Sequence, residues 1–153
     1  MQLSFLWLSA TALFSQAASG FYLKSRHSVL SKYGFASLND RETTPAEVGF
    51  TFPHTYRPIS IDLDENGNLS GDFVLRKVAQ EAWALVSTAT AGERQSTDIT
   101  GPFALDKERE ILYTGKEGLV WAVCSRSGHY GLTLVPRTYP DRRCVHDIEL
   151  VAV

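Results

Sequence analysis

The chain has almost no surplus charge of either sign. Its 153 residues include 15 Lys and Arg against 17 Asp and Glu, a formal net charge of -2. General nucleic-acid binding needs a strong basic surplus to neutralise phosphates, so this balance argues against nucleic acid as a partner. The length is that of one domain, and it is sufficient to bury a core of average size.

The short motifs of common enzymes are also missing. The sequence contains no nucleophile elbow, no His-Glu-x-x-His and no phosphate loop. Asp and Glu are plentiful, but they fall in turns without any sign of the carboxylate pairing that glycoside hydrolysis needs. The sequence therefore predicts no catalytic residues, no metal site and no cofactor.

Histidines near the two cysteines offer the one alternative that would be catalytic. His129 and His146, with Asp147 or Glu149, could form an acid–base pair of the ribonuclease kind. His146 and Asp147 are neighbours, however, and neighbours on a strand point to opposite faces. Histidines on exposed turns are the simpler interpretation.

An apolar run long enough to cross a membrane, about 20 residues, is absent. The apolar stretch from Leu3 to Phe14 is shorter and is interrupted by Ser and Thr. Small residues from Ala17 to Gly20 follow it, as at a signal-peptidase site, although no Lys or Arg precedes the apolar core. We predict a signal peptide over residues 1–19 and a secreted domain over 20–153, located outside the cell or in the cell wall, with no membrane contact once the leader is removed.

Cysteine is scarce, with only Cys124 and Cys144. Two cysteines in a secreted chain are expected to pair. Closing a loop of this length contributes roughly 3 kcal/mol by chain entropy. A metal site is the poorer alternative, because the spacing is not that of metal-binding thiols.

The remaining sequence consists mostly of short alternating apolar runs between Gly, Pro, Asp and Ser clusters, the pattern of β-strands. This predicts an all-β fold, a single β-sandwich or a small β-barrel. For residues 81–87 a short helix is the alternative to a strand, and residues 88–101 are expected to form an exposed loop. Strands are predicted over residues 34–38, 48–52, 59–63, 73–78, 81–87, 103–105, 111–113, 119–124, 130–135 and 144–153.

Asn66-Gly67 between apolar runs is a strong hairpin signal, because a type I′ turn needs positive φ at both central residues. The same stretch, from Asp62, matches the first half of a calcium loop. Its twelfth position is Phe73 instead of a bidentate Glu, and its flanks are strand-like, so we favour the hairpin. A similar strand, turn and strand occur near Phe103 to Leu112, either as a repeated unit or, the favoured interpretation, as an unrelated hairpin.

Two surface features are candidate sites. Asn68-Leu-Ser70 is an N-x-S sequon, predicted to carry a glycan in a secreted protein. A basic segment with one aromatic residue is the candidate for binding an anionic polymer or a sugar, although a solvated loop fixed by Cys144 is the simpler interpretation. Its predicted ligand-binding residues are Arg137, Tyr139, Arg142 and Arg143. Trp83 and Trp121 are expected to pack in the core.

The C-terminal third carries a resemblance to a known family. Trp121-x-Val-Cys124, Tyr130-x-Leu-x-Leu134 and Cys144-x-x-x-Ile148-x-Leu150 occur in order after Phe103-x-Leu and Leu112-Tyr113. This order resembles the fungal cell-wall protein PhiA family and related small secreted fungal proteins. The resemblance implies a β-protein held in or near the cell wall, without catalytic residues.

We therefore expect a small secreted fungal protein that is extracellular or cell-wall-associated and not an enzyme. Cell-wall polysaccharide is its expected partner. A secreted carbohydrate-binding or host-directed effector module is the first alternative. A small secreted hydrolase or ribonuclease is the second.

Overall fold

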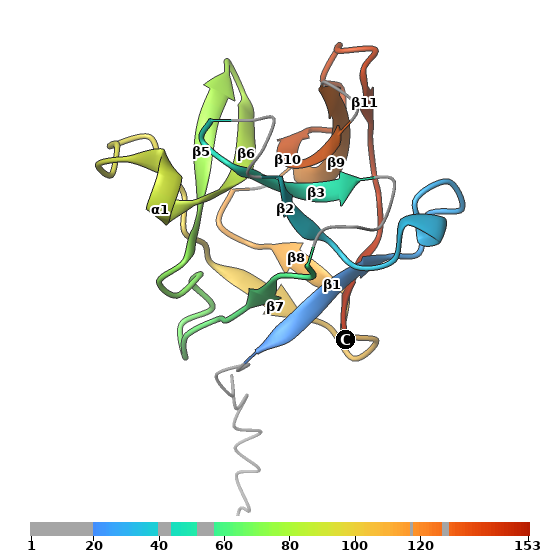
Figure 1. Ribbon diagram of the computed structural model, residues 1–153, viewed down its shortest axis with the longest axis horizontal. Coiled ribbons are helices and arrows are strands. Elements are labelled where there is room, and N and C mark those ends of the chain that lie inside the picture. Colours follow the sequence, from blue (N-terminus) through green and yellow to red (C-terminus); the bar gives the residue numbers. More distant parts are fainter. Residues whose placement is uncertain (1–19, 40–43, 52–56, 117, 127–128) are drawn as a thin grey trace, which may run out of the picture.

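The computed structural model describes residues 20–39, 44–51, 57–116, 118–126 and 129–153. The predicted leader lies outside them. The prediction of an all-β fold is confirmed, since short antiparallel strands dominate (Figure 1). No helix in the described part of the chain is long and apolar enough to cross a membrane. The strands are β1 (Phe21–Ser25), β2 (Ser37–Asn39), β3 (Glu47–Thr51), β4 (Ser60–Ile61), β5 (Phe73–Ala79), β6 (Ala82–Ser87), β7 (Phe103–Leu105), β8 (Ile111–Tyr113), β9 (Leu119–Arg126), β10 (His129–Pro136), β11 (Cys144–Val145) and β12 (Leu150–Ala152), with a 3-10 helix η1 (Ser31–Tyr33) and a short helix α1 (Thr88–Ala91).

Six short stretches of the chain close into a barrel, in the lower part of Figure 1. They are β1, the residues from β4 to Leu63, the residues around Leu69, β7, β8 and β12. β1 pairs with β12 on one side and with β4 on the other. The chain after β4 forms the bridge Leu63–Leu69, and the Leu69 amide donates to the carbonyl of Thr100, just before β7 (2.7 Å). β7 pairs with β8, and the bridge Glu110–Val151 returns from β8 to β12. The ring of strands is therefore closed.

Three hairpins, β2–β3, β5–β6 and β9–β10, cap one end of the barrel. Each hairpin lies in the sequence between two stretches of the barrel, and the inner strands β3, β6 and β10 pair with one another. This arrangement has pseudo-threefold symmetry and is the topology of a β-trefoil. Of the two predicted architectures, the barrel is the one that forms.

The core lies between barrel and cap. Because side chains alternate along a strand, one face of each cap hairpin points into the barrel, and Phe50, Leu85 and Leu132 join barrel residues in one buried cluster. Trp121 belongs to this core: its ring stacks on Phe103 with centroids 5.7 Å apart, and its indole N–H donates to a buried carbonyl. The prediction for Trp121 is confirmed.

The two hairpins that looked alike in sequence have the same turn. The Asp64 carboxylate oxygen Oδ1 accepts from the amides of residues 66 and 68, at 2.8 and 2.9 Å. Oδ1 of Asp106 accepts from the amides of residues 108 and 110 at the same distances. In each turn the fourth residue, Gly67 or Arg109, has positive φ. The hairpins also occupy equivalent positions around the barrel, so they are structurally equivalent units of the fold.

The prediction of a type I′ turn is also wrong. Only Gly67 has positive φ in the first hairpin, whereas Asn66 does not. The amide of Gly67 donates to the carbonyl of Asp64 (3.0 Å), which makes a type I turn followed by a left-handed residue. The Asp64 side chain, which accepts two local amides, stabilises this conformation instead.

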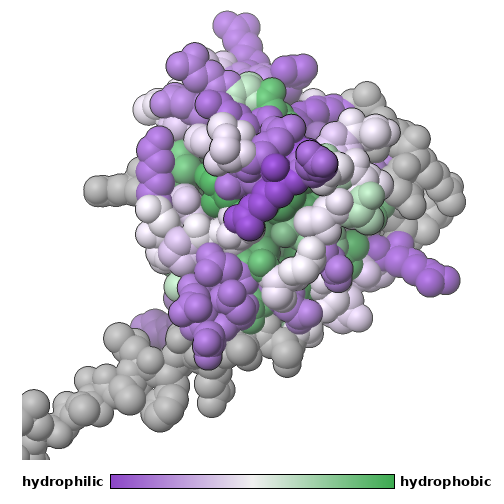
Figure 2. Space-filling view, turned by 90° about the vertical axis from the view of Figure 1, so that its left-hand side faces the viewer, coloured by the Kyte–Doolittle hydropathy of each residue, from purple (hydrophilic) through white to green (hydrophobic). Residues whose placement is uncertain are grey.

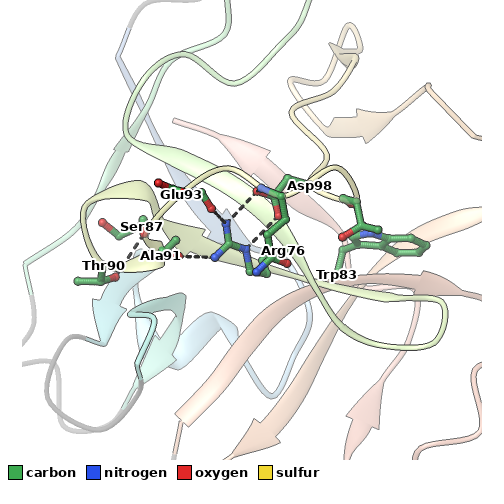
Figure 3. Close-up of polar contacts among 9 residues, drawn as sticks. Arg76, Trp83, Ser87, Thr90, Ala91, Glu93 and Asp98 are labelled. Atoms are coloured by element: carbon green, nitrogen blue, oxygen red, sulfur yellow. Dashed lines mark hydrogen bonds and ion pairs between the residues drawn. The ribbon is translucent and has the colours of Figure 1, made fainter.

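Residues 88–101, predicted to be an exposed loop, begin with α1 and fold against β5 (Figure 3). Arg76 on β5 forms two hydrogen bonds with the Asp98 carboxylate, at 2.9 and 3.0 Å, and donates to the carbonyls of Ala91 and Glu93. The Trp83 indole donates to the carbonyl of Thr97 (3.1 Å). The Trp83 side chain is half-buried and packs against the edge of the core. Most of the segment is exposed, as predicted, and Arg76 fixes it against β5.

The predicted closing strand over residues 144–153 is divided in two. β11 pairs with β9 in the cap, whereas β12 pairs with β1 in the barrel. The chain turns between them at Asp147, which has a φ of 52°. A continuous strand could not serve both layers, so the change of direction follows from the architecture.

Candidate functional site

The predicted disulfide is confirmed. Cys124 on β9 and Cys144 on β11 lie directly opposite each other, with an S–S distance of 2.04 Å and Cα atoms 4.0 Å apart. Both residues are buried. The bond attaches the predicted ligand-binding segment, residues 137–143, to the rim of the cap.

A cavity of about 270 Å³ opens beside this bond, and we call it the disulfide cavity. Two of the four predicted ligand-binding residues, Tyr139 and Arg143, line this cavity. Arg137 lines a different cavity, near β8, where it lies 3.6 Å from Asp147, and Arg142 is exposed. The side chains that line the disulfide cavity include Glu47, Ala79, Arg126, Tyr139, Asp141 and Arg143.

The charges of the disulfide cavity occur in two ion pairs. Arg126 on β9 lies 2.6 Å from Glu47 on β3, and β10 lies between these two strands in the sheet. The Arg143 guanidinium donates two hydrogen bonds to Asp141, at 2.9 and 3.1 Å, and its backbone amide donates a third. These bonds hold the pKa of Asp141 at about 2. The cavity therefore offers donors and acceptors without a net charge.

Tyr139 supplies the aromatic surface of the cavity. Its ring packs against the small cluster around the disulfide, and it lies 6.4 Å from the ring of His146. The side chain is half-buried. A polar cavity with one aromatic wall is suited to a ligand that has both hydroxyl groups and an apolar ring face.

His129, at the start of β10, is fully buried. Its Nδ1 atom is 2.9 Å from the hydroxyl of Thr51, and its Nε2 atom is 4.0 Å from the Glu47 carboxylate. Burial, with a further contribution from Arg126, lowers the pKa of His129 to about 4. The imidazole is therefore neutral at pH 7.

The structure does not bring His129 and His146 together. His129 pairs with Arg126 on one side of β9, whereas Val145, next to His146, pairs with Val123 on the other side. His129 therefore lies opposite position 126 of β9 and His146 opposite position 122. These positions are about 13 Å apart along the strand at the rise of a β-strand. The acid–base pair considered as an alternative is not assembled.

Asn68 of the sequon is half-buried at the end of the Asp64 turn. Its backbone amide donates to the Asp64 carboxylate. Its side-chain oxygen lies so close to Gly101 that a Cβ atom at position 101 would be 2.8 Å from it. Ser70, the third residue of the sequon, is exposed. Glycosylation of Asn68 stays a prediction.

A further cavity, of about 280 Å³, lies between α1 and β5. This side of the molecule shows hydrophilic side chains around apolar surface (Figure 2). Arg76 and Asp98 line the cavity, but each is already bonded to the other and to the backbone. We assign these two charges to the stability of the fold.

Sequence reasoning missed Glu47, Arg126 and Asp141. Glu47 and Arg126 are 79 positions apart, and no local pattern joins them. Asp141 had a local signal, because it is two residues from Arg143 within the basic segment. Comparisons with protein-family models, with curated proteins and with solved structures give no match to this chain.

Proposed function

We propose that this is a secreted, non-catalytic protein that binds neutral cell-wall polysaccharide in the disulfide cavity. The observation that carries the proposal is the gathering of two guanidinium–carboxylate pairs and Tyr139 around one cavity beside the disulfide. Uncharged hydroxyl groups can both donate to carboxylates and accept from guanidinium groups. Tyr139 offers a ring against which the apolar face of a sugar packs.

Three observations support a location outside the cell. The Cys124–Cys144 bond belongs to an oxidising compartment. The leader-like residues 1–19 and the sequon at Asn68 fit the secretory route. The resemblance to the PhiA family favours retention in or near the wall, which is also where a polysaccharide ligand is abundant.

Isothermal titration of the mature protein with soluble β-glucan and chitin oligosaccharides tests this function. We expect Tyr139→Ala to weaken binding about tenfold, in line with the loss of one aromatic contact. Arg142→Gln is the matched control, because Arg142 belongs to the same segment but is exposed and does not line the disulfide cavity. Equal binding by both variants and the wild type, or no binding to either polymer, would refute the proposal.

A further inference from the structure

Another cavity, of about 320 Å³, lies beside η1, and we call it the aromatic cavity. Its lining differs from that of the disulfide cavity: it has aromatic rings, hydroxyl groups and one cation, and no carboxylate among the described residues. No residue within the described ranges lines both cavities. The side chains of the aromatic cavity include Lys32, Tyr33, Phe35, Ser37, Thr51 and Pro58.

The aromatic surface continues beyond the cavity. Phe35 is 37% exposed, and its ring lies 5.5 Å from that of Tyr22, which is 43% exposed. The ring of Tyr33 packs against that of Tyr130, with the ring centroids 5.7 Å apart and the ring planes inclined at 60°. Gly34, with a φ of 73°, turns the chain between Tyr33 and Phe35 and so allows both rings to border one cavity. Large apolar side chains exposed together commonly mark a binding surface.

Two lysines add positive charge to this surface. The ammonium group of Lys32 lies 5.4 Å from the ring centroid of Tyr33, and that of Lys24 lies 6.0 Å from the centroid of Phe35. Among the described residues, every ion pair uses an arginine or a histidine, and neither lysine takes part in one. Their charges are therefore available to an anion.

We infer that the aromatic cavity binds an acidic saccharide, a polymer of uronic acid residues. The apolar face of the sugar ring would pack on Phe35, and its carboxylate would pair with Lys32, with Lys24 at the neighbouring ring. A neutral glycan would offer no opposite charge to either ammonium group, so the two lysines would add little to its binding. A nucleic acid fits less well, because the chain as a whole carries a net charge of -2.

The position of the cavity makes it independent of the proposed neutral-sugar site. Glu47, at the start of β3, lines the disulfide cavity, whereas Thr51, at the end of the same strand, lines the aromatic cavity. The rise of a β-strand places these two positions about 13 Å apart. The two cavities are therefore separate sites on the molecule.

Calorimetry with trigalacturonate, and with its methyl ester as the neutral control ligand, tests this inference. We expect the wild type to bind the acid at least tenfold more tightly than the ester, because a charge-assisted hydrogen bond is lost with the carboxylate. Binding of the acid should weaken as sodium chloride is raised from about 50 to about 500 mM, since the lysines are solvent-accessible. Equal affinity for acid and ester would overturn the inference.

Variants then locate the site. We expect Lys32→Gln to weaken trigalacturonate binding about tenfold. Phe35→Leu keeps an apolar side chain without the aromatic face, and it should weaken the binding of both trigalacturonate and its methyl ester. Lys116→Gln is the control, because Lys116 also lies over an aromatic ring, that of Trp83, away from this cavity. Tyr139→Ala should bind trigalacturonate like the wild type, which separates this inference from the proposed function. Unchanged binding in Lys32→Gln, or preference for a single-stranded oligonucleotide over trigalacturonate, would refute it.

Discussion

Arg76 shows how much one buried charge can organise. Its guanidinium group contacts Asp98 and two backbone carbonyls, and the Asp98 side chain has 0% exposed surface. The bonds from Arg76 hold the pKa of Asp98 below its ordinary value. A carboxylate in this position depends on its partner, because an unpaired charge in the interior is strongly unfavourable.

We expect Arg76→Met to lower the free energy of unfolding by about 3 to 5 kcal/mol, because it leaves Asp98 buried and uncompensated. Urea denaturation measures this loss. Arg26→Met is the matched control: Arg26 pairs with Glu149 at the surface, where a salt bridge contributes at most about 1 kcal/mol. Adding Asp98→Asn to Arg76→Met should recover part of the loss. Equal effects of the two single arginine variants would contradict this account of the pair.

His129 predicts a pH dependence of stability. Its pKa is lowered from 6.5 to about 4 in the folded protein, so between these values the unfolded chain binds a proton that the folded chain does not. Stability is therefore fully present above pH 6.5 and falls as the pH drops toward 4, by an amount on the order of 3 kcal/mol. Unfolding midpoints at several pH values, for the wild type and for His129→Gln, measure it. The same slope in both proteins would rule out His129 as its source.

Residue types alone identified part of the candidate site. Tyr139 and Arg143 were predicted from a basic segment next to a cysteine, and the structure places both at the disulfide cavity. Glu47 and Arg126 were not predicted, because β3 and β9 belong to different hairpins and only the pairing of both strands with β10 brings them close. The aromatic cavity was not predicted either, because it joins residues from η1 to β2 with Thr51 on β3 and Pro58, and no local pattern connects these segments.

At the scale of single elements, the two equivalent hairpin turns depend on their aspartates. One oxygen of each carboxylate accepts two backbone amides, which a turn would otherwise expose to water or leave unpaired. Bonds of this kind are local, because each joins an aspartate to amides two and four residues further along the chain. They also explain why the turn type could not be read from Asn66-Gly67 alone.

We expect Asp106→Ala to lower the free energy of unfolding by about 1 to 3 kcal/mol, because two hydrogen bonds to a charged oxygen are lost. Asp64→Ala should have a similar effect at the equivalent turn. Asp72→Ala is the control, since Asp72 is exposed and its side chain has no hydrogen bond recorded within the described residues. Thermal denaturation of the three variants gives the comparison, and an effect of Asp72→Ala as large as the other two would contradict the role of the turns.

Strand existence was well predicted from alternation, and strand partners were not. The hairpin β9–β10 follows directly from two alternating runs separated by a short turn. β4, by contrast, pairs with β1, about 40 positions earlier in the chain, instead of with the strand that follows it. Alternation determines which face of a strand is buried but says nothing about its neighbours in the sheet.

At the scale of the whole molecule, the disulfide joins β9 to β11, the cap strand from which the chain continues to the closing barrel strand β12. We expect the double variant Cys124→Ser, Cys144→Ser to lose about 3 kcal/mol of stability, because the unfolded chain is no longer constrained. The loss of the bond also frees residues 137–143, so binding of neutral oligosaccharide should fall, whereas trigalacturonate binding at the aromatic cavity should persist. Urea denaturation and calorimetry on the same samples measure both effects. Full retention of neutral-sugar binding would contradict the role of the bond in holding the site.

The threefold arrangement could not be predicted from the sequence. Its only trace was the likeness of residues 61–69 to residues 103–112, which is too short to establish a repeat. The equivalence lies in backbone pairing, and strands of different sequence can form the same pairing when each buries one apolar face.

The closed ring also affects how this protein meets other copies of itself. An open sheet ends in a row of unpaired amides that can template the strands of another chain and lead to fibrils. Here each of the six barrel stretches has hydrogen-bonded neighbours on both sides among the described residues. A protein built in this way can accumulate to high local concentration on a polymer surface without its barrel strands seeding aggregation.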